Sequence, residues 1–182
     1  DIYVTMDYFG SNAPISLDYL ERFRKMEGVT RAFPRIVGRA YFANRLATIV
    51  GILPENLPKS IRLTQGRMLS EKGDVIVGEG LAREFRLQPG VRFSLSINTS
   101  RLLRVAGIFD SDATIWSANL ILMSFEDASE FFRMKGKATD ILIYARPGYA
   151  AFLAKDIQEK TEISSPGQLE PPLRVQDKTM VK

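Results

Sequence analysis

The residue types that most often carry catalysis are scarce in this chain. Its 182 residues contain no histidine and no cysteine, which excludes disulfides, thiolate chemistry and the commonest general base and metal ligand. The chain also lacks a Gly-x-Ser-x-Gly elbow and a Walker-type phosphate loop, and no histidine is present to activate a serine or threonine. The sequence therefore predicts no catalytic, cofactor-binding or metal-binding residue, and we expect a protein that is not an enzyme.

Three short patterns approach known sites without completing them. Gly78-Glu79-Gly80 precedes a helical segment as a dinucleotide loop would, but Arg83 stands where that motif has its third glycine. Asp110 and Asp112 flank a serine, but the ligand spacing of a calcium loop is missing, which favours a turn. Asn98-Thr99-Ser100 fits a glycosylation sequon, yet a polar hairpin turn is the favoured interpretation.

Two further features are candidates for binding. Arg31, Arg35 and Arg39 are separated by even numbers of residues, so they would share one face of a strand. That face could meet lipid head groups or an acidic partner, although a solvated strand face is the favoured interpretation. Trp116, the only tryptophan, could anchor a partner, but a place in the core is favoured. Partner-binding residues therefore stay unknown at this level.

The composition is that of a globular protein. Hydrophobic residues make up 45% and charged residues 25% of the chain, and no apolar run approaches the roughly 20 residues of a membrane-spanning helix. The net charge of +4 is modest and its two signs are interspersed, which argues against a nucleic-acid partner. Because the chain starts at Asp1 rather than methionine, we expect it to be a piece of a longer protein.

Hydrophobic periodicity and turn residues divide the chain into strands and helices. Ser16 is the expected N-cap of a first helix that stops at Gly28, and Ser124 begins a capping box. Phe152 is expected on the buried side of the last helix, and Trp116 in a loop or at a strand edge. The expected strands are 1–9, 35–42, 46–52, 75–77, 91–97, 102–108, 120–123 and 141–145, and the expected helices are 16–26, 81–85, 124–132 and 149–160.

The order of these elements predicts an α+β fold with two lobes. Each end of the chain provides a strand–helix–strand unit, whereas the middle provides hairpins and one short helix. Packed layers around shared cores then favour a sheet-and-helix lobe built from residues 1–65 and 124–182, with residues 66–123 inserted as a β-rich lobe.

Several short motifs follow one another between Ala32 and Phe132. They are Ala32-Phe33-Pro34, Thr48-Ile49-Val50-Gly51-Ile52, Gln65-Gly66-Arg67, Asp74-Val75-Ile76-Val77-Gly78-Glu79-Gly80-Leu81-Ala82 with Phe85, Leu87-Gln88-Pro89-Gly90-Val91, Arg104-Val105-Ala106-Gly107-Ile108-Phe109 and the helix Ser124 to Phe132. Their order and spacing over roughly half the chain resemble the MacB-like periplasmic core domain of ABC transporter permeases of the MacB, LolC/LolE and FtsX group.

This resemblance implies a fold, a location and partners. The end-built lobe would be porter-like, and the domain would lie outside the inner (cytoplasmic) membrane, facing the periplasm or cell exterior, between transmembrane helices before Asp1 and after Lys182. It would transmit conformational change driven by a separate cytoplasmic ABC ATPase, beside a second permease copy. Its periplasmic partner would be an adaptor, a lipoprotein carrier or a hydrolase, for efflux, lipoprotein release or hydrolase regulation.

Two functions of different class therefore remain. The leading one is a non-catalytic domain that transmits motion and binds a partner. The alternative is an extracytoplasmic domain that senses or binds a small molecule, which would require one apolar pocket with convergent polar groups.

Overall fold

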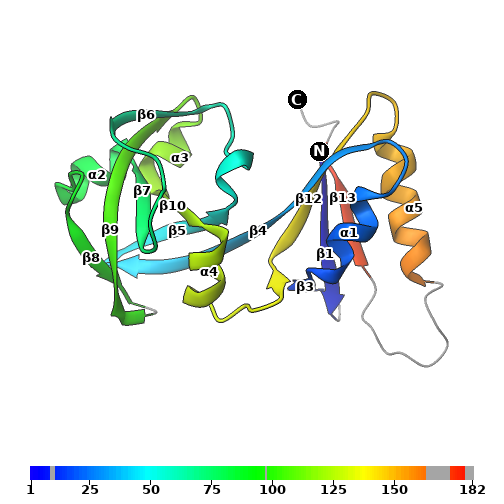
Figure 1. Cartoon of the computed structure of the whole chain (residues 1–182), viewed down its shortest axis with the longest axis horizontal. Helices are drawn as coiled ribbons and strands as arrows, with labels where there is room; N and C mark the ends of the chain where they lie inside the picture. Colours follow the sequence, from blue (N-terminus) through cyan, green and yellow to red (C-terminus); the bar gives the residue numbers. More distant parts are fainter. Residues whose placement is uncertain (9–10, 97, 163–172, 179–182) are drawn as a thin grey trace. The chain divides into compact units, whose positions relative to one another are not determined.

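The computed structural model describes residues 1–8, 11–96, 98–162 and 173–178, which form strands and helices (Figure 1). The chain divides into two compact units, and each is described by itself. Unit 1 comprises residues 1–35 and 136–182, and unit 2 comprises residues 36–135. Strands and helices occur in both units, so the predicted α+β class is confirmed. Within the described residues, no helix is long and apolar enough to cross a membrane.

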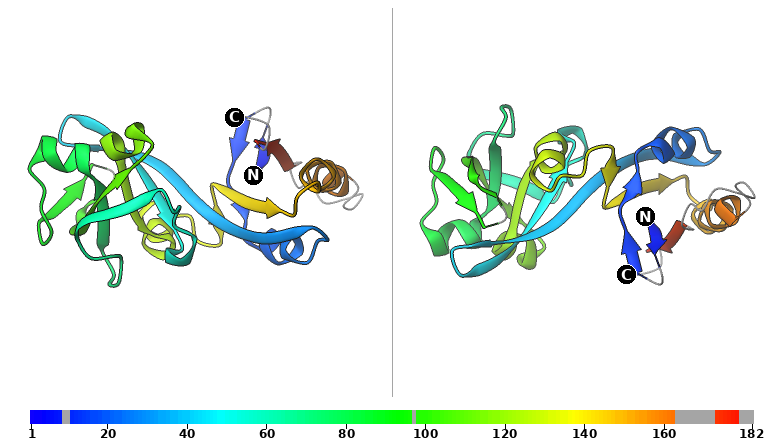
Figure 2. Two further views of the ribbon diagram at one scale, coloured as in Figure 1. Left: turned by 90° about the horizontal axis from the view of Figure 1, so that it is seen from above. Right: turned by 90° about the horizontal axis from the view of Figure 1, so that it is seen from below.

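Unit 1 is built on an antiparallel sheet with the strand order β13-β1-β12-β4. Its elements are β1 (Ile2–Tyr8), β2 (Ser11–Ala13), β3 (Ile15–Ser16), α1 (Asp18–Arg24), the first part of β4 (Val29–Phe42), β11 (Lys137–Ala138), β12 (Asp140–Ala145), α5 (Ala150–Glu162) and β13 (Leu173–Asp177). β2 pairs with β1, and β3 pairs with β11. Helix α5 lies beside β13 (Figures 1 and 2).

The core of unit 1 follows from alternation along its strands. In β1 and β12 the residues Ile2, Val4, Ile141 and Ile143 lie opposite one another in register and are fully buried. Successive side chains of a strand point to opposite faces, so all four occupy one face of the sheet. Helix α5 contributes the buried Leu153.

Unit 2 is a mixed sheet with three helices, α2 to α4. Its elements are the second part of β4, β5 (Arg45–Ile52), the short 3-10 helix η1 (Pro54–Asn56), β6 (Ile61–Gly66), β7 (Asp74–Gly78), α2 (Glu79–Phe85), β8 (Arg92–Leu95), β9 (Asn98–Ser111), α3 (Thr114–Asn119), β10 (Leu120–Ser124) and α4 (Phe125–Phe131). The strand order is β4-β5-β10-β7-β9-β6, with β8 also on β9. The pairs β5–β10 and β7–β9 are parallel, and the others are antiparallel.

Aromatic residues pack tightly in the core of unit 2. The Phe42 ring meets the rings of Phe85 and Phe93 edge to face, at centroid distances of 4.5 and 5.0 Å. Nearby, Ser96 exchanges two hydrogen bonds with the backbone of Tyr41, because its N–H donates to the carbonyl oxygen (3.1 Å) and its hydroxyl accepts from the N–H (3.0 Å). These bonds hold the end of β8 against β4.

The compact units have different boundaries from those expected. The sequence placed residues 66–123 in the inserted lobe, whereas unit 2 spans residues 36–135. Strand pairing explains the difference, since β5 joins β10 and β6 joins β9. Strands β5 and β6 are thereby bonded to strands of unit 2, whereas the argument from packed layers had grouped residues 1–65 with residues 124–182.

Most predicted elements occur, and three predictions about the first helix, the turn at Asn98 and the last helix are corrected first. The hairpin of β4 and β5 and the capping of α4 are confirmed, since the Ser124 hydroxyl accepts the Asp127 N–H at 3.0 Å. The first helix begins at Asp18, and its N-cap residue is Leu17. The predicted N-cap was Ser16. Asn98–Ser100 was expected to be a turn, but β9 already begins at Asn98 because its backbone pairs with β8.

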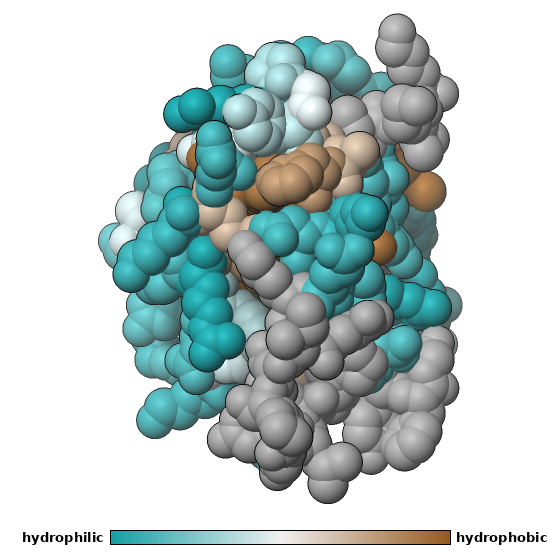
Figure 3. Space-filling model, turned by 90° about the vertical axis from the view of Figure 1, so that its right-hand side faces the viewer, coloured by the Kyte–Doolittle hydropathy of each residue, from teal (hydrophilic) through white to brown (hydrophobic). Residues whose placement is uncertain are grey.

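The third correction concerns the last helix. Phe152 was predicted to face inward, but 60% of its surface is exposed, because Leu153 and Ile157 occupy the buried side. Figure 3 shows apolar surface on the side of the molecule at which α5 lies in Figure 1. The proline-rich segment with Pro166, Pro171 and Pro172 lies outside the described residues.

Candidate partner-binding site

A network of charged side chains surrounds Asp74 at the start of β7. The Asp74 carboxylate has no exposed surface, and it accepts hydrogen bonds from two arginines. Arg67 donates at 2.5 Å, and Arg104 of β9 donates at 2.8 and 3.1 Å. The backbone N–H groups of Ser70 and Glu71 donate at 3.2 and 2.9 Å. This network (Arg67, Ser70, Glu71, Asp74 and Arg104) fastens the loop before β7 to β9.

The network keeps Asp74 ionised. Burial alone would raise the pKa of this carboxyl, but the hydrogen bonds from Arg67 and Arg104, with those from the backbone of Glu71 and Ser70, outweigh burial and lower the pKa far below its usual range. A carboxylate that accepts this many donors is held in one geometry. At neutral pH the loop of residues 70–73 is therefore held by an ionised carboxylate.

A second cluster holds the same loop from the side of α4. The Gly73 N–H donates to the Asp127 carboxylate at 2.8 Å, and Arg101 pairs with both Asp127 (3.3 Å) and Glu130 (2.9 Å). Lys72 also donates to Glu130, and the hydrogen bonds from Lys72 and Arg101 lower the pKa of Glu130. The loop is thus tied to β9 on one side and to α4 on the other.

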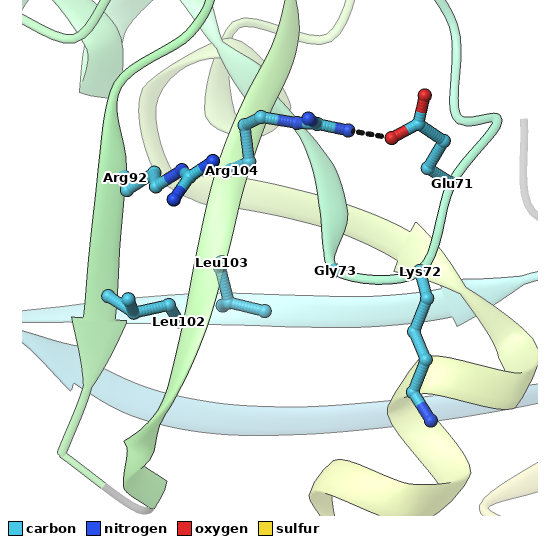
Figure 4. Close-up of a pocket in the computed structure, with 7 residues that line it drawn as sticks. All are labelled: Glu71, Lys72, Gly73, Arg92, Leu102, Leu103 and Arg104. Atoms are coloured by element: carbon cyan, nitrogen blue, oxygen red, sulfur yellow. Dashed lines mark hydrogen bonds and ion pairs between the residues drawn. The ribbon is translucent and has the colours of Figure 1, made fainter.

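Between this loop and β9 lies a small hollow. It has a volume of about 200 Å3 and is lined by Glu71, Lys72, Gly73, Arg92, Leu102, Leu103 and Arg104. Arg92 and Arg104 project from the neighbouring strands β8 and β9, and Arg104 reaches across to Glu71 (Figure 4). Leu102 is 61% exposed, whereas Leu103 is buried. The hollow therefore combines cationic groups with an exposed apolar side chain.

A larger hollow runs along α4. Its volume is about 620 Å3, and its lining is Phe125, Glu126, Ser129, Glu130, Arg133 and Lys135. All of these residues belong to α4 or directly follow it, so no second element brings polar groups towards the same point. It lacks the convergence that a small-molecule pocket needs.

The two glycines of the dinucleotide-like pattern have a packing role. A Cβ atom at Gly78 would lie 2.3 Å from the Ser117 carbonyl oxygen, and one at Gly80 would lie 3.0 Å from the Ala118 Cα. The glycines therefore let α3 approach the start of α2. The Arg45 side chain completes this contact, because it donates to the Ala118 carbonyl and pairs with Glu84 of α2.

Helix α3 also corrects the expectation for Trp116. This residue was placed in a loop or strand and assigned to the core, but it lies on α3 and is 37% exposed, beside Ile115 at 69%. A six-residue helix is too short to show apolar periodicity. Ser117 of the same helix donates to Asp110 at 2.9 Å, and Arg62 pairs with Asp110 and Asp112. These two carboxylates thus act in ion pairs within unit 2.

The three arginines of β4 have separate environments. Arg35 forms two hydrogen bonds with Asp140, at 3.0 and 2.8 Å, and Arg31 lies over the rings of Phe33 and Tyr144. The favoured interpretation of a solvated strip is wrong for Arg35, whose side chain is only 23% exposed. Arg39 belongs to unit 2 and is exposed.

Comparison with protein families decides what kind of domain this is. Residues 1–159 match the family described as the MacB-like periplasmic core domain. The chain belongs to that family. The resemblance expected from motifs is therefore confirmed, and the match also includes the N-terminal residues, in which few motifs were recognised. Members of this family are non-catalytic periplasmic domains of ABC transporter permeases.

Solved structures of this family share the fold. The periplasmic region of MacB from Actinobacillus actinomycetemcomitans matches with a TM-score of 0.66 at 12% identity, covering 97% of this chain and 87% of the other. The extracellular domain of the noncanonic ABC-type transporter YknZ from Gram-positive bacteria also has a TM-score of 0.66 at 12% identity, covering 97% and 99%. A search among curated proteins finds no match.

The hollow beside Arg92 is the feature of this family member that sequence reasoning missed. Arg92 was expected at a polar position of the strand 91–97, and residues 102–108 were expected to pair with that strand as a hairpin, which is confirmed. The sequence did not indicate which residues of the two strands lie opposite each other. The structure places the two residues directly opposite each other. The alternation Arg92-Phe93-Ser94-Leu95, read together with the Pro89-Gly90 turn, was the one signal that pointed to this face.

Proposed function

We propose that this domain transmits ATP-driven conformational change across the membrane and binds a periplasmic partner. The observation that carries the proposal is the pairing of the first and last described strands. β1 and β13 are antiparallel neighbours, with Ile2 opposite Asp177, and the Lys178 N–H donates to the Asp1 carbonyl oxygen at 2.9 Å. Segments attached at these two ends would therefore act on one continuous hydrogen-bonded ladder.

The proposal assigns each partner a role. Transmembrane segments on both sides would connect unit 1 to a permease in the inner membrane, next to a second permease copy. A cytoplasmic ABC ATPase would supply the motion, and the domain would hold an adaptor, a lipoprotein carrier or a hydrolase outside the membrane. The tightly paired charges of unit 2 support this role, because a body that passes on motion must keep its internal geometry.

Distance measurements in the intact permease test the proposal. These 182 residues contain no cysteine. In a permease in which any cysteine elsewhere is replaced by serine, the single substitutions Lys25→Cys in unit 1 and Asn44→Cys in unit 2 provide spin-label sites on exposed residues. In the reconstituted permease with its ATPase, we expect the distances between the two copies to change on ATP binding. A hydrolysis-deficient ATPase is the control and should arrest the cycle. Equal distances in every nucleotide state would rule the proposal out.

A thermal-shift screen on the same preparation distinguishes the proposed function from the alternative, a domain that senses a small molecule. A ligand that binds only the native state raises its melting temperature. A thermal-shift screen with amino acids, sugars and lipids should leave the melting temperature unchanged if the domain transmits motion, whereas stabilisation by one compound would favour the sensor.

A further inference from the structure

Of the charged side chains that line the hollow of about 200 Å3, Glu71, Lys72 and Arg104 form ion pairs, whereas Arg92 has no counter-ion among the described residues. Among residues 1–8, 11–96, 98–162 and 173–178, its side chain has no hydrogen bond or ion pair. Arg104 lies directly opposite on β9, but its guanidinium is already bonded to Glu71 and Asp74. Lys72 is bonded to Glu130. Arg92 is thus the group of this hollow that is available to a ligand.

The strand register makes an anion favourable at this position. Like charges directly opposite each other on antiparallel strands destabilise the pair, and Arg92 faces Arg104 in this way. A carboxylate beside Arg92 would relieve that repulsion and gain charge-assisted hydrogen bonds. The Asp74 network holds Arg104 and Glu71 in place beforehand, so binding would order few side chains.

The hollow also has an apolar side. Leu102 precedes Arg104 by two residues on β9, so both side chains lie on the face that carries Arg92. Leu102 is 61% exposed, which leaves apolar surface next to the cation. A ligand that carries a carboxylate and an adjacent apolar group would satisfy both.

Size decides which ligand of this chemistry fits. Pockets for free small molecules usually measure about 300–1,000 Å3, whereas this hollow measures about 200 Å3. We propose that it receives an aspartate or glutamate side chain of a partner protein, with an apolar neighbour of that residue packed on Leu102. This inference rests on the proposed function only in that the partner is the periplasmic protein which the domain binds.

Site-specific photo-crosslinking in the intact permease tests the site. Ser94 is exposed and lies on the same strand face as Arg92, so a benzophenone amino acid in place of Ser94 would sit at the rim. A second probe in place of the exposed Asn44, in the turn between β4 and β5, is the positional control. After irradiation in the native membrane, we expect the probe at position 94 to label a partner peptide at or next to an acidic residue, and the probe at position 44 not to label it.

Matched variants show whether Arg92 is responsible. Arg92→Ala should lower the yield at position 94 about tenfold, which corresponds to about 1.4 kcal/mol, and Arg92→Lys should restore part of it. Arg39→Ala removes another exposed arginine of unit 2 that has no side-chain partner among the described residues, so it should leave the yield unchanged. In the free permease, Arg92→Ala should not lower the melting temperature, because it removes a like-charge contact. Equal yields in Arg92→Ala and Arg39→Ala would overturn the site.

Defined probes separate a partner side chain from a free anion. The probes are the labelled, acetylated peptide Ser-Leu-Asp-Leu-Ser, its Asn counterpart, succinate and inorganic phosphate. Fluorescence anisotropy on the permease in nanodiscs should show binding of the Asp peptide, abolished by Arg92→Ala, and at least about tenfold weaker binding of the Asn peptide. Displacement by succinate or phosphate as effective as by unlabelled Asp peptide would overturn the inference in favour of a small-anion site. ATP-dependent distances that persist while both binding assays fail would remove this site and leave the proposed function intact.

Discussion

Asp74 in unit 2 and Asp140 in unit 1 are both buried strand aspartates paired with arginine, but they are held differently. Asp74 accepts hydrogen bonds from two arginines and two backbone N–H groups, and its side chain has no exposed surface. Asp140 pairs with Arg35 alone among the described side chains, and 12% of its side chain is exposed.

The difference lies in what each carboxylate connects. Arg35 and Asp140 are register partners on the neighbouring strands β4 and β12, so their ion pair reinforces a ladder that backbone hydrogen bonds already form. Asp74 and Arg104 are also register partners, on the parallel strands β7 and β9. Asp74 additionally accepts hydrogen bonds from Arg67 and from the backbone of Ser70 and Glu71, so it joins these strands to the irregular loop between β6 and β7. The Arg35–Asp140 ion pair therefore adds to a ladder that already exists, whereas the Asp74 network determines the path of a loop that lines the candidate site.

Neutralising Asp74 should cause the largest loss of stability. Asp74→Asn leaves two arginines and two backbone donors facing a group that cannot accept them all, and removing one partner of a buried pair typically costs about 3–5 kcal/mol. We expect a loss of that size in the free energy of unfolding, measured by urea denaturation. Asp112→Asn is the control, because Asp112 is 72% exposed in its pair with Arg62 and should cost about 0–1 kcal/mol. A loss below that of the control would contradict the role of the network.

The effect of Asp74→Asn should depend on pH. The pKa of Asp74 is lowered in the folded state, so the carboxylate contributes its full stability above the unfolded pKa of about 3.9 and loses it as pH falls through the folded value. Unfolding free energies of both proteins, measured from pH 7 downwards, should differ by a constant amount to about pH 5 and converge below about pH 4. If the difference in unfolding free energy between the two proteins stayed constant into the acid range, the neighbours of Asp74 would not lower its pKa in the folded state.

Neutralising Asp140 should cost less. Asp140→Asn removes a charge-assisted pair at a partly exposed site, for which about 1.5–3 kcal/mol is expected, and the ladder between β4 and β12 remains. Urea denaturation under the same conditions measures the difference. If Asp140→Asn were as costly as Asp74→Asn, the number of segments joined would not be what distinguishes the two sites.

The contrast also shows which features a sequence can predict. The strand around Val75–Val77, the capped helix after Ser124 and the turn at Pro89-Gly90 depend on neighbouring residues, and all three occur where local patterns placed them. The Asp74 network and the opposition of Arg92 to Arg104 depend on how β7, β8 and β9 align. A single sequence does not contain these registers, because the parallel pair β7–β9 joins residues as far apart as 74 and 104, and the antiparallel pair β8–β9 has an irregularity between Phe93 and Leu95 that shifts its register.

Helix α3 was missed for a related reason. Its six residues carry no capping side chain and little periodicity, so intrinsic propensity predicts no helix there. Its position depends on Gly78, Gly80 and Arg45, which are distant in the sequence. The exposure of Trp116 follows from these contacts and not from its own hydrophobicity, which explains why the expectation of a core position failed.

Exchanging arginine for lysine should give the smallest losses of stability. It tests whether the other donors to Asp74 compensate for a weakened Arg104. Lysine keeps the charge but cannot make two fixed hydrogen bonds to one carboxylate. Arg35→Lys removes the bidentate contact with Asp140 and weakens the contact of Arg35 with the Tyr3 ring, 5.0 Å away, so we expect a loss of about 1–2 kcal/mol. Arg104→Lys should cost less than Arg35→Lys in the same urea assay, because Arg67 and the backbone of Ser70 and Glu71 still bond to Asp74. A larger loss for Arg104→Lys than for Arg35→Lys would mean that Arg104 alone, rather than the shared set of donors, holds the loop beside Arg92.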